Sequence, residues 1–356
     1  MSNFLNARHA ALEAYVPGEQ PTDQKYIKLN TNESPYPPLP EVVTAAAEAA
    51  ALCHLYSDPE GKALRAKLAA RYGVEPAQTI LGNGSDEILS FAFQAFGGPD
   101  TPVAFPDISY GFYPVYANLY GIPAKVIPLR DDFTVCADDY IGLGCGMIVI
   151  ANPNAPTGLA LGLDDVARIC AGNPSSVVLI DEAYVDFGAK SAVSLLADHP
   201  NLLVVQTFSK SRSLAGGRLG YAIASAEIIA DLNRIKYSIN PYNINRMTLA
   251  AGEAILDHDD ICAARCAEIA ATRAYTSEEL RKLGFTLTDS LTNFLFARPA
   301  DGDAAGMYAE LRKRGILVRY FSGARVCEYL RITVGTREQM DALLDAVRAI
   351  LEEKGA

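Results

Sequence analysis

Short apolar runs separated by helix-like stretches fill the chain between residues 79 and 225. The runs lie at 79–81, 103–105, 147–150, 177–180 and 202–208. Runs that are apolar throughout are typical of strands buried on both faces. Because helical patterns such as 87–96 separate them, the chain predicts an α/β fold with a mostly parallel central sheet and helices on both faces.

The pattern changes after about residue 255. A long helical stretch through Arg281 leads to short strand-like runs and further helices, at 294–296, 304–314, 316–319, 330–334 and 337–353. We predict a smaller α+β domain at 256–356 and a larger, cofactor-binding domain at 41–255. Residues 1–40 are irregular and rich in proline, so we expect an arm that packs with the small domain.

Polar clusters follow the apolar runs of the larger domain. They are Gly82–Asp86, the stretch from Pro106 to Tyr110, Asn152–Asn154, Asp181–Tyr184 and Ser209–Lys210. In doubly wound α/β sheets, ligands bind outside the carboxyl ends of the strands. We therefore expect these clusters to converge on one site.

Lys210 is the most informative of these residues. It directly follows a buried run, and small residues and a second cation come after it at Gly216, Gly217 and Arg218. Partial desolvation or crowding by other cations lowers the pKa of a lysine and makes its amine a nucleophile that can form a Schiff base.

The neighbouring clusters provide the groups that would hold a phosphate. Residues 82–86, with Gly84, Ser85 and Asp86, place small side chains and free backbone amides before a helix, which is typical of an anion site. Thr207, Ser209 and Arg218 can add two hydroxyls and a guanidinium.

The remaining clusters suit an aromatic ring. Asp181 is a fixed carboxylate that can keep a ring nitrogen protonated, and Asn154 and Tyr184 can hydrogen-bond a phenolic oxygen. Tyr110 can stack on the ring. A phosphate, a basic ring nitrogen, a phenolic oxygen and an aldehyde that reacts with Lys210 together predict pyridoxal 5′-phosphate as the cofactor.

The composition of the chain narrows the range of possible binding partners. The chain has 356 residues, half of them hydrophobic, and a formal net charge of −11, which argues against a nucleic-acid or membrane surface. Without a spanning apolar run or a signal-peptide pattern, we expect a cytoplasmic protein. The seven cysteines form no Cys-x-x-Cys pair and the four histidines are scattered, so we expect no metal site.

The motifs, taken together, resemble those of the fold-type I pyridoxal-phosphate enzymes of the aminotransferase class I/II superfamily. Within it the chain most closely resembles the histidinol-phosphate aminotransferases, over nearly its whole length. The motifs are Lys-Leu-Asn-Thr-Asn-Glu-Ser-Pro at 28–35, Tyr-Ser-Asp-Pro at 56–59, Gly-Ser-Asp-Glu at 84–87, Asn-Pro-Asn-Ala-Pro-Thr-Gly at 152–158, Asp-Glu-Ala-Tyr at 181–184, Ser-Lys at 209–210 and Tyr-Leu-Arg-Ile-Thr-Val-Gly at 329–335.

The resemblance implies a reaction of histidine biosynthesis, in which L-histidinol phosphate and 2-oxoglutarate give imidazole acetol phosphate and L-glutamate. It implies a homodimer with shared active sites, in which Tyr56 reaches the cofactor phosphate of the other subunit. Arg331 would bind the α-carboxylate of a substrate, and Tyr15 and Arg319 the phosphate of histidinol phosphate. Asn32 of the first motif is also expected to contact the substrate.

The resemblance is not uniform, and it leaves alternatives. Relatives often have proline where this chain has Ser57, and asparagine or serine where it has Ala155; neither change removes an expected cofactor ligand. An aromatic amino-acid aminotransferase would need no phosphate site for its substrate. A threonine-phosphate decarboxylase uses a very similar scaffold, although the motif at 28–33 favours a transaminase. The sequence does not decide among the three.

Overall fold

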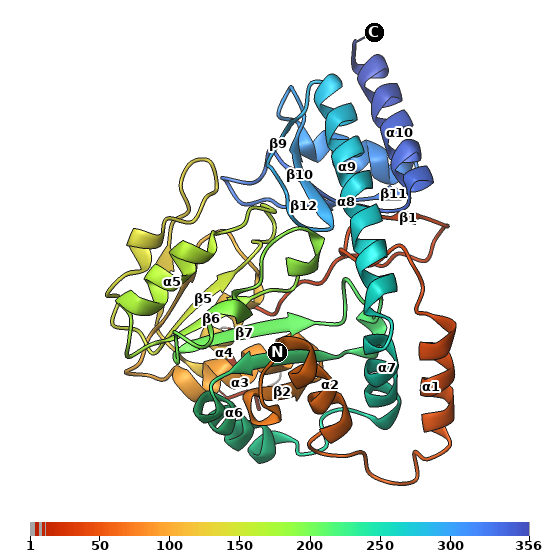
Figure 1. The fold of residues 1–356 in the computed structure, drawn as a ribbon. Coiled ribbons are helices and arrows are strands. Elements are labelled where there is room, and N and C mark those ends of the chain that lie inside the picture. Colours follow the sequence, from red (N-terminus) through yellow and green to blue (C-terminus); the bar gives the residue numbers. More distant parts are fainter. Residues whose placement is uncertain (1–3, 7–8, 11, 356) are drawn as a thin grey trace.

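The computed structural model describes residues 4–6, 9–10 and 12–355 (Figure 1). Within them a seven-stranded sheet has the order β2-β8-β7-β6-β5-β3-β4. Its strands are β2 (Thr79–Gly82), β3 (Val103–Pro106), β4 (Ala124–Ile127), β5 (Met147–Ala151), β6 (Val177–Asp181), β7 (Leu202–Thr207) and β8 (Gly220–Ala224). Only the pairings of β8 are antiparallel, so the predicted mostly parallel sheet is confirmed.

Helices cover both faces of this sheet. They are α1 (Pro40–Ala50), α2 (Lys62–Tyr72), α3 (Ser85–Phe96), α4 (Phe112–Tyr120), α5 (Leu163–Gly172), α6 (Ala226–Ile239) and α7 (Arg246–Leu256). Neighbouring strand residues point to opposite faces. Leu179 accordingly packs in the core with α3, α4 and α6, whereas Ile180 packs in the core with α5. Burial on both sides explains why these strands are apolar throughout.

Two strands of the sheet differ from this pattern of large apolar residues throughout. The edge strand β4 is mostly exposed, and its sequence Ala-Lys-Val-Ile is not apolar throughout. Strand β8 is buried but contains small residues, and Gly220 lies so close to α3 that an added Cβ would be 2.4 Å from the backbone nitrogen of Ser85. Close approach of β8 to this helix therefore explains the glycine.

The C-terminal part of the chain forms an antiparallel sheet with the order β12-β13-β10-β9. Its elements are α8 (Asp259–Lys282), β9 (Thr286–Leu287), β10 (Phe294–Arg298), α9 (Ala304–Lys313), β11 (Ile316–Leu317), β12 (Arg319–Tyr320), β13 (Leu330–Thr333) and α10 (Arg337–Gly355). The helices and this sheet share one apolar core, at the top of Figure 1.

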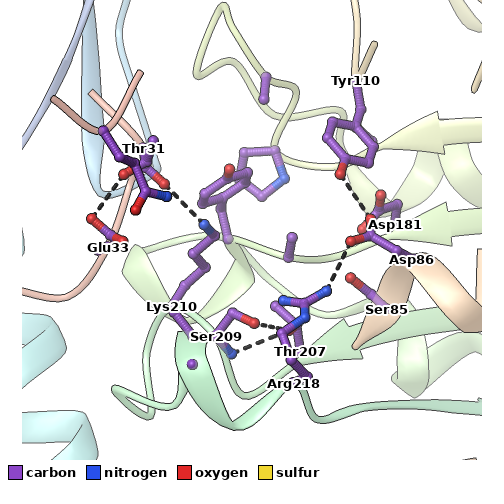
Figure 2. A pocket seen from close by; sticks show the side chains of 18 residues that line it. Thr31, Glu33, Ser85, Asp86, Tyr110, Asp181, Thr207, Ser209, Lys210 and Arg218 are labelled. Atoms are coloured by element: carbon purple, nitrogen blue, oxygen red, sulfur yellow. Dashed lines mark hydrogen bonds and ion pairs between the residues drawn. The ribbon is translucent and has the colours of Figure 1, made fainter. Parts of the chain in front are cut away.

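The N-terminal arm lies against this C-terminal part. Strand β1 (Ile27–Lys28) pairs in parallel with β11, and the backbone nitrogen of Thr333 donates to the oxygen of Leu29 at 2.9 Å. Residues 29–33 then continue toward the carboxyl ends of the large sheet, where Thr31 meets Lys210 (Figure 2). The arm thereby connects the two sheets at one place.

Candidate active site

Two adjoining cavities lie at the carboxyl ends of the large sheet. The first, of about 470 Å³, is lined by nine of the predicted residues: Ser85, Asp86, Tyr110, Asp181, Tyr184, Thr207, Ser209, Lys210 and Arg218 (Figure 2). The second, of about 960 Å³, shares Tyr110, Tyr184 and Lys210 with the first and is also lined by Tyr15, Asn32, Arg319 and Arg331. The expected convergence of strand ends thus occurs, and the predicted substrate residues lie beside the predicted cofactor residues.

Lys210 extends from the end of β7 into the space between the cavities. Its Nζ donates to the backbone oxygen of Thr31 at 3.2 Å and lies 5.9 Å from the centre of the Tyr184 ring. Burial first, and then the charge of Arg331, lower the pKa of Lys210 to about 8. The direction agrees with the sequence-based expectation, and the amine is a better nucleophile near neutral pH than an ordinary lysine.

Asp181 offers an unpaired oxygen to a ligand. Its Oδ2 accepts from the Tyr113 hydroxyl at 2.8 Å, and its Oδ1 is buried without a hydrogen-bond partner among the described residues. Burial raises the pKa of Asp181 to about 6, with a further contribution from the Asp86 carboxylate. A protonated ring nitrogen is a donor that would satisfy Oδ1 and favour the ionised carboxylate.

Another group of residues lining the first cavity suits an anion. Gly84 precedes α3 with a φ of 79°, and an added Cβ would be 2.4 Å from Nη2 of Arg218. Ser85 begins the helix, where free backbone amides favour a phosphate. Thr207 and Ser209 approach with hydroxyl oxygens 3.0 Å apart. The predicted phosphate-binding residues therefore lie around one place.

Tyr110 is fixed at the wall of both cavities. Its hydroxyl donates to Oδ1 of Asp86 at 2.7 Å, and Arg218 donates to Oδ2 of the same carboxylate at 3.0 Å. Burial and the charge of Asp86 raise the pKa of Tyr110, so the ring stays neutral. An immobilised neutral ring is suited to stacking on an aromatic ligand.

Tyr184 is oriented by a residue far away in the sequence. Asn32 donates from Nδ2 to the Tyr184 hydroxyl at 2.9 Å, while its own Oδ1 accepts from Thr333 at 3.1 Å. Because the Tyr184 oxygen already accepts from Asn32, its hydrogen is available to a ligand. Asn32 has a φ of 56°, a conformation that asparagine tolerates better than most residues.

Three predicted cofactor residues are not among those that line the cavities: Gly84, described above, Asn154 and Tyr56. Asn154 is buried, but its Nδ2 donates to the oxygens of Ile108 and Thr157, at 2.9 and 3.0 Å. Tyr56 is 80% exposed and stacks on Tyr242 with ring centres 4.5 Å apart. Contacts of Asn154 and Tyr56 with the cofactor stay predictions.

The sequence reasoning missed several residues of the site. Tyr113, which holds Asp181, is on α4 and had no signal beyond its position in an aromatic helix. Glu33 lines the first cavity, pairs with Lys28 at 2.6 Å, and its charge opposes the lowered pKa of Lys210. The motif at 28–35 contains Glu33, and that motif was the only available signal for it.

The substrate-side arginines face each other across two strands. Arg319 of β12 and Arg331 of β13 are directly paired in the antiparallel register. Arg319 donates to the backbone oxygens of Val16 and Pro17, at 3.2 and 3.4 Å, and Arg331 to that of Asn30 at 3.2 Å. Among the described residues neither forms an ion pair with an acidic side chain, and Nε of Arg331 is buried without a partner.

Comparison with known proteins identifies the class of this protein. The model of the family described as aminotransferase class I and II matches residues 24–347. The chain therefore belongs to the aminotransferase class I and II family, and it is a pyridoxal-phosphate-dependent aminotransferase. The α/β sheet and the cavity at its carboxyl edge agree with that assignment.

Individual relatives place the chain more narrowly. It is 49% identical to histidinol-phosphate aminotransferase of Aromatoleum aromaticum over 355 residues, which are 99% of this chain and all of that protein. It is also 49% identical to the enzyme of the same name from a Marinomonas species, over 98% of this chain. The crystal structure of histidinol-phosphate aminotransferase from Sinorhizobium meliloti with pyridoxal-5′-phosphate has a TM-score of 0.84 and 26% identity, over 92% of each chain.

The residues present fit this cofactor. The unpaired Oδ1 of Asp181 matches a ring N–H, the amine of Lys210 matches the aldehyde, and the groups around Ser85 match the phosphate. The hydroxyl of Tyr184 has a hydrogen left to donate. In the part of the chain that the structure describes, no cluster of three or more His, Cys, Asp or Glu could hold a metal, and no helix is long and apolar enough to cross a bilayer.

Proposed function

We propose that this enzyme transfers the amino group of L-histidinol phosphate to 2-oxoglutarate, giving imidazole acetol phosphate and L-glutamate. The single observation that carries the proposal is the pair of arginines on β12 and β13, which line the substrate-side cavity without an acidic partner among the described residues. Like charges directly opposite on neighbouring strands destabilise a sheet. An anionic substrate would relieve that repulsion. The names of the relatives favour histidinol phosphate over other anions.

The position of Tyr15 supports a second anion-binding contact. Tyr15 stacks on Phe112 with ring centres 4.3 Å apart, and its hydroxyl group is in a region where the charges of Arg331 and Arg319 oppose the rise in its pKa that burial causes. A phenol and two guanidinium groups around one cavity form a donor-rich surface. Such a surface suits a phosphate or a carboxylate.

The protein's own residues would act in fixed roles. Bound pyridoxal phosphate supplies a carbonyl carbon that exchanges amino groups and a ring that accepts electrons. Lys210 is placed to take the proton from the substrate's α-carbon and to return it, as general base and acid. Asp181 holds a proton on the ring nitrogen, and Tyr184 donates to the phenolic oxygen. The walls around Tyr110 and Arg218 keep the ring and phosphate in place.

Two other reactions fit the same cofactor site. An aromatic amino-acid aminotransferase would use the aromatic wall of Tyr15, Tyr110 and Tyr320 without a phosphate. A threonine-phosphate decarboxylase would release carbon dioxide. Incubation with each donor and 2-oxoglutarate separates them: glutamate formed from histidinol phosphate supports the proposal, whereas carbon dioxide from threonine phosphate, or turnover restricted to aromatic donors, contradicts it.

Replacing Arg319 by alanine should lower kcat/KM for histidinol phosphate at least about tenfold, and less for aromatic amino acids. Losing one charge-assisted contact costs about 1.5–3 kcal/mol. Replacing Arg331 by alanine should instead harm glutamate and aromatic donors most, because they present the α-carboxylate. Steady-state kinetics on the three donors measure both effects.

The matched control is Arg314→Ala. Arg314, the C-cap residue of α9, forms an ion pair with Glu353 at 2.6 Å and lines neither cavity. Its replacement should leave all three kcat/KM values near those of the wild type. Equal losses on every donor after Arg319→Ala would remove the main support for a phosphorylated substrate.

We further propose that the enzyme is a homodimer in which Tyr56 completes the partner's site. The proposal is supported by exposed apolar side chains around Tyr56. Tyr56 and Tyr242 form a stacked, exposed pair, and the exposed residues Leu52, Leu55 and Ile239 lie close to them in the sequence. Exposed apolar groups of this kind are typical of interfaces. Sedimentation should show two chains per particle. The proposed location is the cytoplasm, which fractionation of cells would test.

Mixing Tyr56→Ala with Lys210→Ala should restore activity. In a hybrid dimer one site keeps both Lys210 and the partner's Tyr56, so random exchange gives about a quarter of the wild-type sites. The control is a mixture of Lys210→Ala and Asp181→Asn, because those residues belong to the same subunit's site and no hybrid site is intact. Hybrids that form but stay inactive in the first mixture contradict the role of Tyr56.

A further inference from the structure

A buried polar network lies behind the cofactor cavity, on the other face of the large sheet. Asp181 and Thr207 line the cavity. Their chain neighbours Glu182 and Gln206 point away from it, because successive residues of a strand alternate between faces. Glu182 is 2% and Gln206 3% exposed. Polar side chains this deeply buried need partners, and their arrangement is therefore informative.

Glu182 accepts hydrogen bonds from three donors. Its Oε1 accepts from the backbone nitrogen of Ala192 at 2.6 Å. Its Oε2 accepts from the hydroxyl of Ser191 at 2.6 Å and from Nε2 of Gln206 at 2.7 Å. Burial raises the pKa of Glu182 to about 7, and these donors oppose the rise. The bond to Gln206 joins the side chain that follows β6 to a side chain of β7.

The other end of Gln206 is held equally firmly. Its Oε1 lies 2.7 and 2.6 Å from the hydroxyls of Tyr72 and Tyr221, which are also 2.7 Å from each other, so the two phenol hydrogens are shared among these three oxygens and the Gln206 oxygen can only accept. Tyr72 ends α2 and Tyr221 belongs to β8, so the network joins three elements around β7. The amide of Gln206 can therefore face only one way: nitrogen toward the carboxylate, oxygen toward the two phenols.

This network lies at the level where the cofactor residues emerge. The backbone nitrogen of Glu182 donates to the oxygen of Val205 at 2.8 Å, beside the side-chain bond to Gln206. The side chains of Asp181 and Thr207 extend from the ends of the same two strands, β6 and β7, on the cavity face. In the proposed site Asp181 would hold the ring nitrogen and Thr207 the phosphate, so the two strand ends would bind two separate groups of the same cofactor.

We propose that Glu182 and Gln206 are positioning residues that fix the separation of Asp181 and Thr207 and thereby set the affinity for pyridoxal phosphate. The inference rests on the roles given to Asp181 and Thr207 in the proposed function, but not on the identity of the amino donor. Neither Glu182 nor Gln206 lines either cavity, so both act through their neighbours. Small errors in such supporting contacts displace the groups that they orient.

A reciprocal exchange of the two side chains tests this inference. In Gln206→Glu a second carboxylate lies against Glu182, and the donor between the strands is lost. In Glu182→Gln, turning the Gln206 amide to restore the bond leaves a buried phenol hydrogen without an acceptor. The double variant Glu182→Gln with Gln206→Glu restores the bond with its direction reversed, and the new carboxylate still accepts from the tyrosine pair.

The measurement is the dissociation constant of pyridoxal phosphate for the cofactor-free protein, from fluorescence titration, with thermal unfolding in parallel. We expect Gln206→Glu to weaken binding at least about tenfold and the double variant to return to within about threefold of the wild type. The control is Asn201→Ala. The Nδ2 of Asn201 donates to three backbone oxygens at the opposite end of β7, so its loss should lower stability and leave cofactor affinity unchanged.

The outcomes separate clearly. Wild-type cofactor affinity in folded Gln206→Glu, or a double variant that binds no better than the weaker single variant, overturns the inference. If Gln206→Glu does not fold, the comparison of the double variant with Glu182→Gln decides in the same way. Because no amino donor is present in the titration, failure of the enzyme to accept histidinol phosphate contradicts only the proposed function.

Discussion

Lys210→Ala is expected to abolish transamination, with a loss of about 10⁴-fold or more in kcat. The substitution removes both the nucleophile that exchanges with the substrate's amino group and the base that moves the α-proton; the proton-transfer role alone is worth about 10²–10⁴-fold. Lys210 also lies where burial and Arg331 lower its pKa to about 8. Formation of glutamate from histidinol phosphate and 2-oxoglutarate is the assay.

Covalent attachment gives an independent test of Lys210. Borohydride reduction of the wild type followed by peptide mass mapping should find the cofactor on Lys210. The rate of attachment to cofactor-free protein should rise as the pH approaches and passes about 8, because the amine reacts only when deprotonated. Lys190→Ala, at an exposed position outside both cavities, is the control and should change neither result. Recovery of the reduced cofactor on another lysine would falsify the assignment.

Asp181→Asn is expected to retain the fold and to lose turnover by about 10²-fold or more. Asparagine has nearly the same shape, and its oxygen can still accept from Tyr113, but it has no charge to stabilise a protonated ring nitrogen. A loss of about 2.7 kcal/mol of transition-state stabilisation corresponds to that factor. Steady-state kinetics at saturating cofactor measure it, and unchanged rates would show that Asp181 does not act on the ring.

The same substitution should stabilise the cofactor-free protein at alkaline pH. The folded state raises the pKa of Asp181 from 3.8 to about 6, so the folded state binds a proton more tightly than the unfolded chain does. The wild type therefore loses stability as the pH rises from about 4 through 6, and the ionised carboxylate costs about 1–3 kcal/mol above that range. Asparagine does not titrate and avoids this cost.

Urea unfolding of both cofactor-free proteins at pH 5 and pH 8 measures the effect. The free energy of unfolding of Asp181→Asn, relative to the wild type, should be higher at pH 8 than at pH 5. Asp198→Asn, at an exposed position, is the control and should show no such difference. An advantage that does not grow with pH would mean that the folded cofactor-free protein does not raise the pKa of Asp181.

Local sequence patterns were sufficient to predict the site residues that lie at the ends of strands. Lys210, Asp181 and Ser85 each follow an apolar run, and the parallel sheet brings the ends of such runs to one edge whatever lies between them. The fold class and the cofactor could therefore be inferred before any contact was known. The division into domains near residue 255 and the cofactor contact of Asn154 stay predictions, because no contact described above tests either of them.

Other parts of the site depend on tertiary contacts that no local pattern encodes. Asn32 meets Tyr184 across 152 positions, and Tyr113 meets Asp181 across 68. The direct pairing of Arg319 with Arg331 follows from the register of β12 and β13, which short strands do not specify in sequence. Resemblance to a family indicated both arginines, but only the structure shows that they are opposite each other.

The pairing of β1 with β11 has a consequence for the order of assembly during translation. Every strand of the seven-stranded sheet has left the ribosome once residue 224 has emerged, and the residues that surround the cofactor end at Arg218. Domains made early in the chain generally fold first during synthesis. The hydrogen bond between Asn32 and Thr333, in contrast, cannot form until Thr333 has been synthesised. Tyr184, which Asn32 holds, is therefore oriented only near the end of translation. The growing chain can thus assemble the strand ends that carry Asp181 and Lys210 about a hundred residues before Tyr184 is oriented and Arg319 and Arg331 have joined the site.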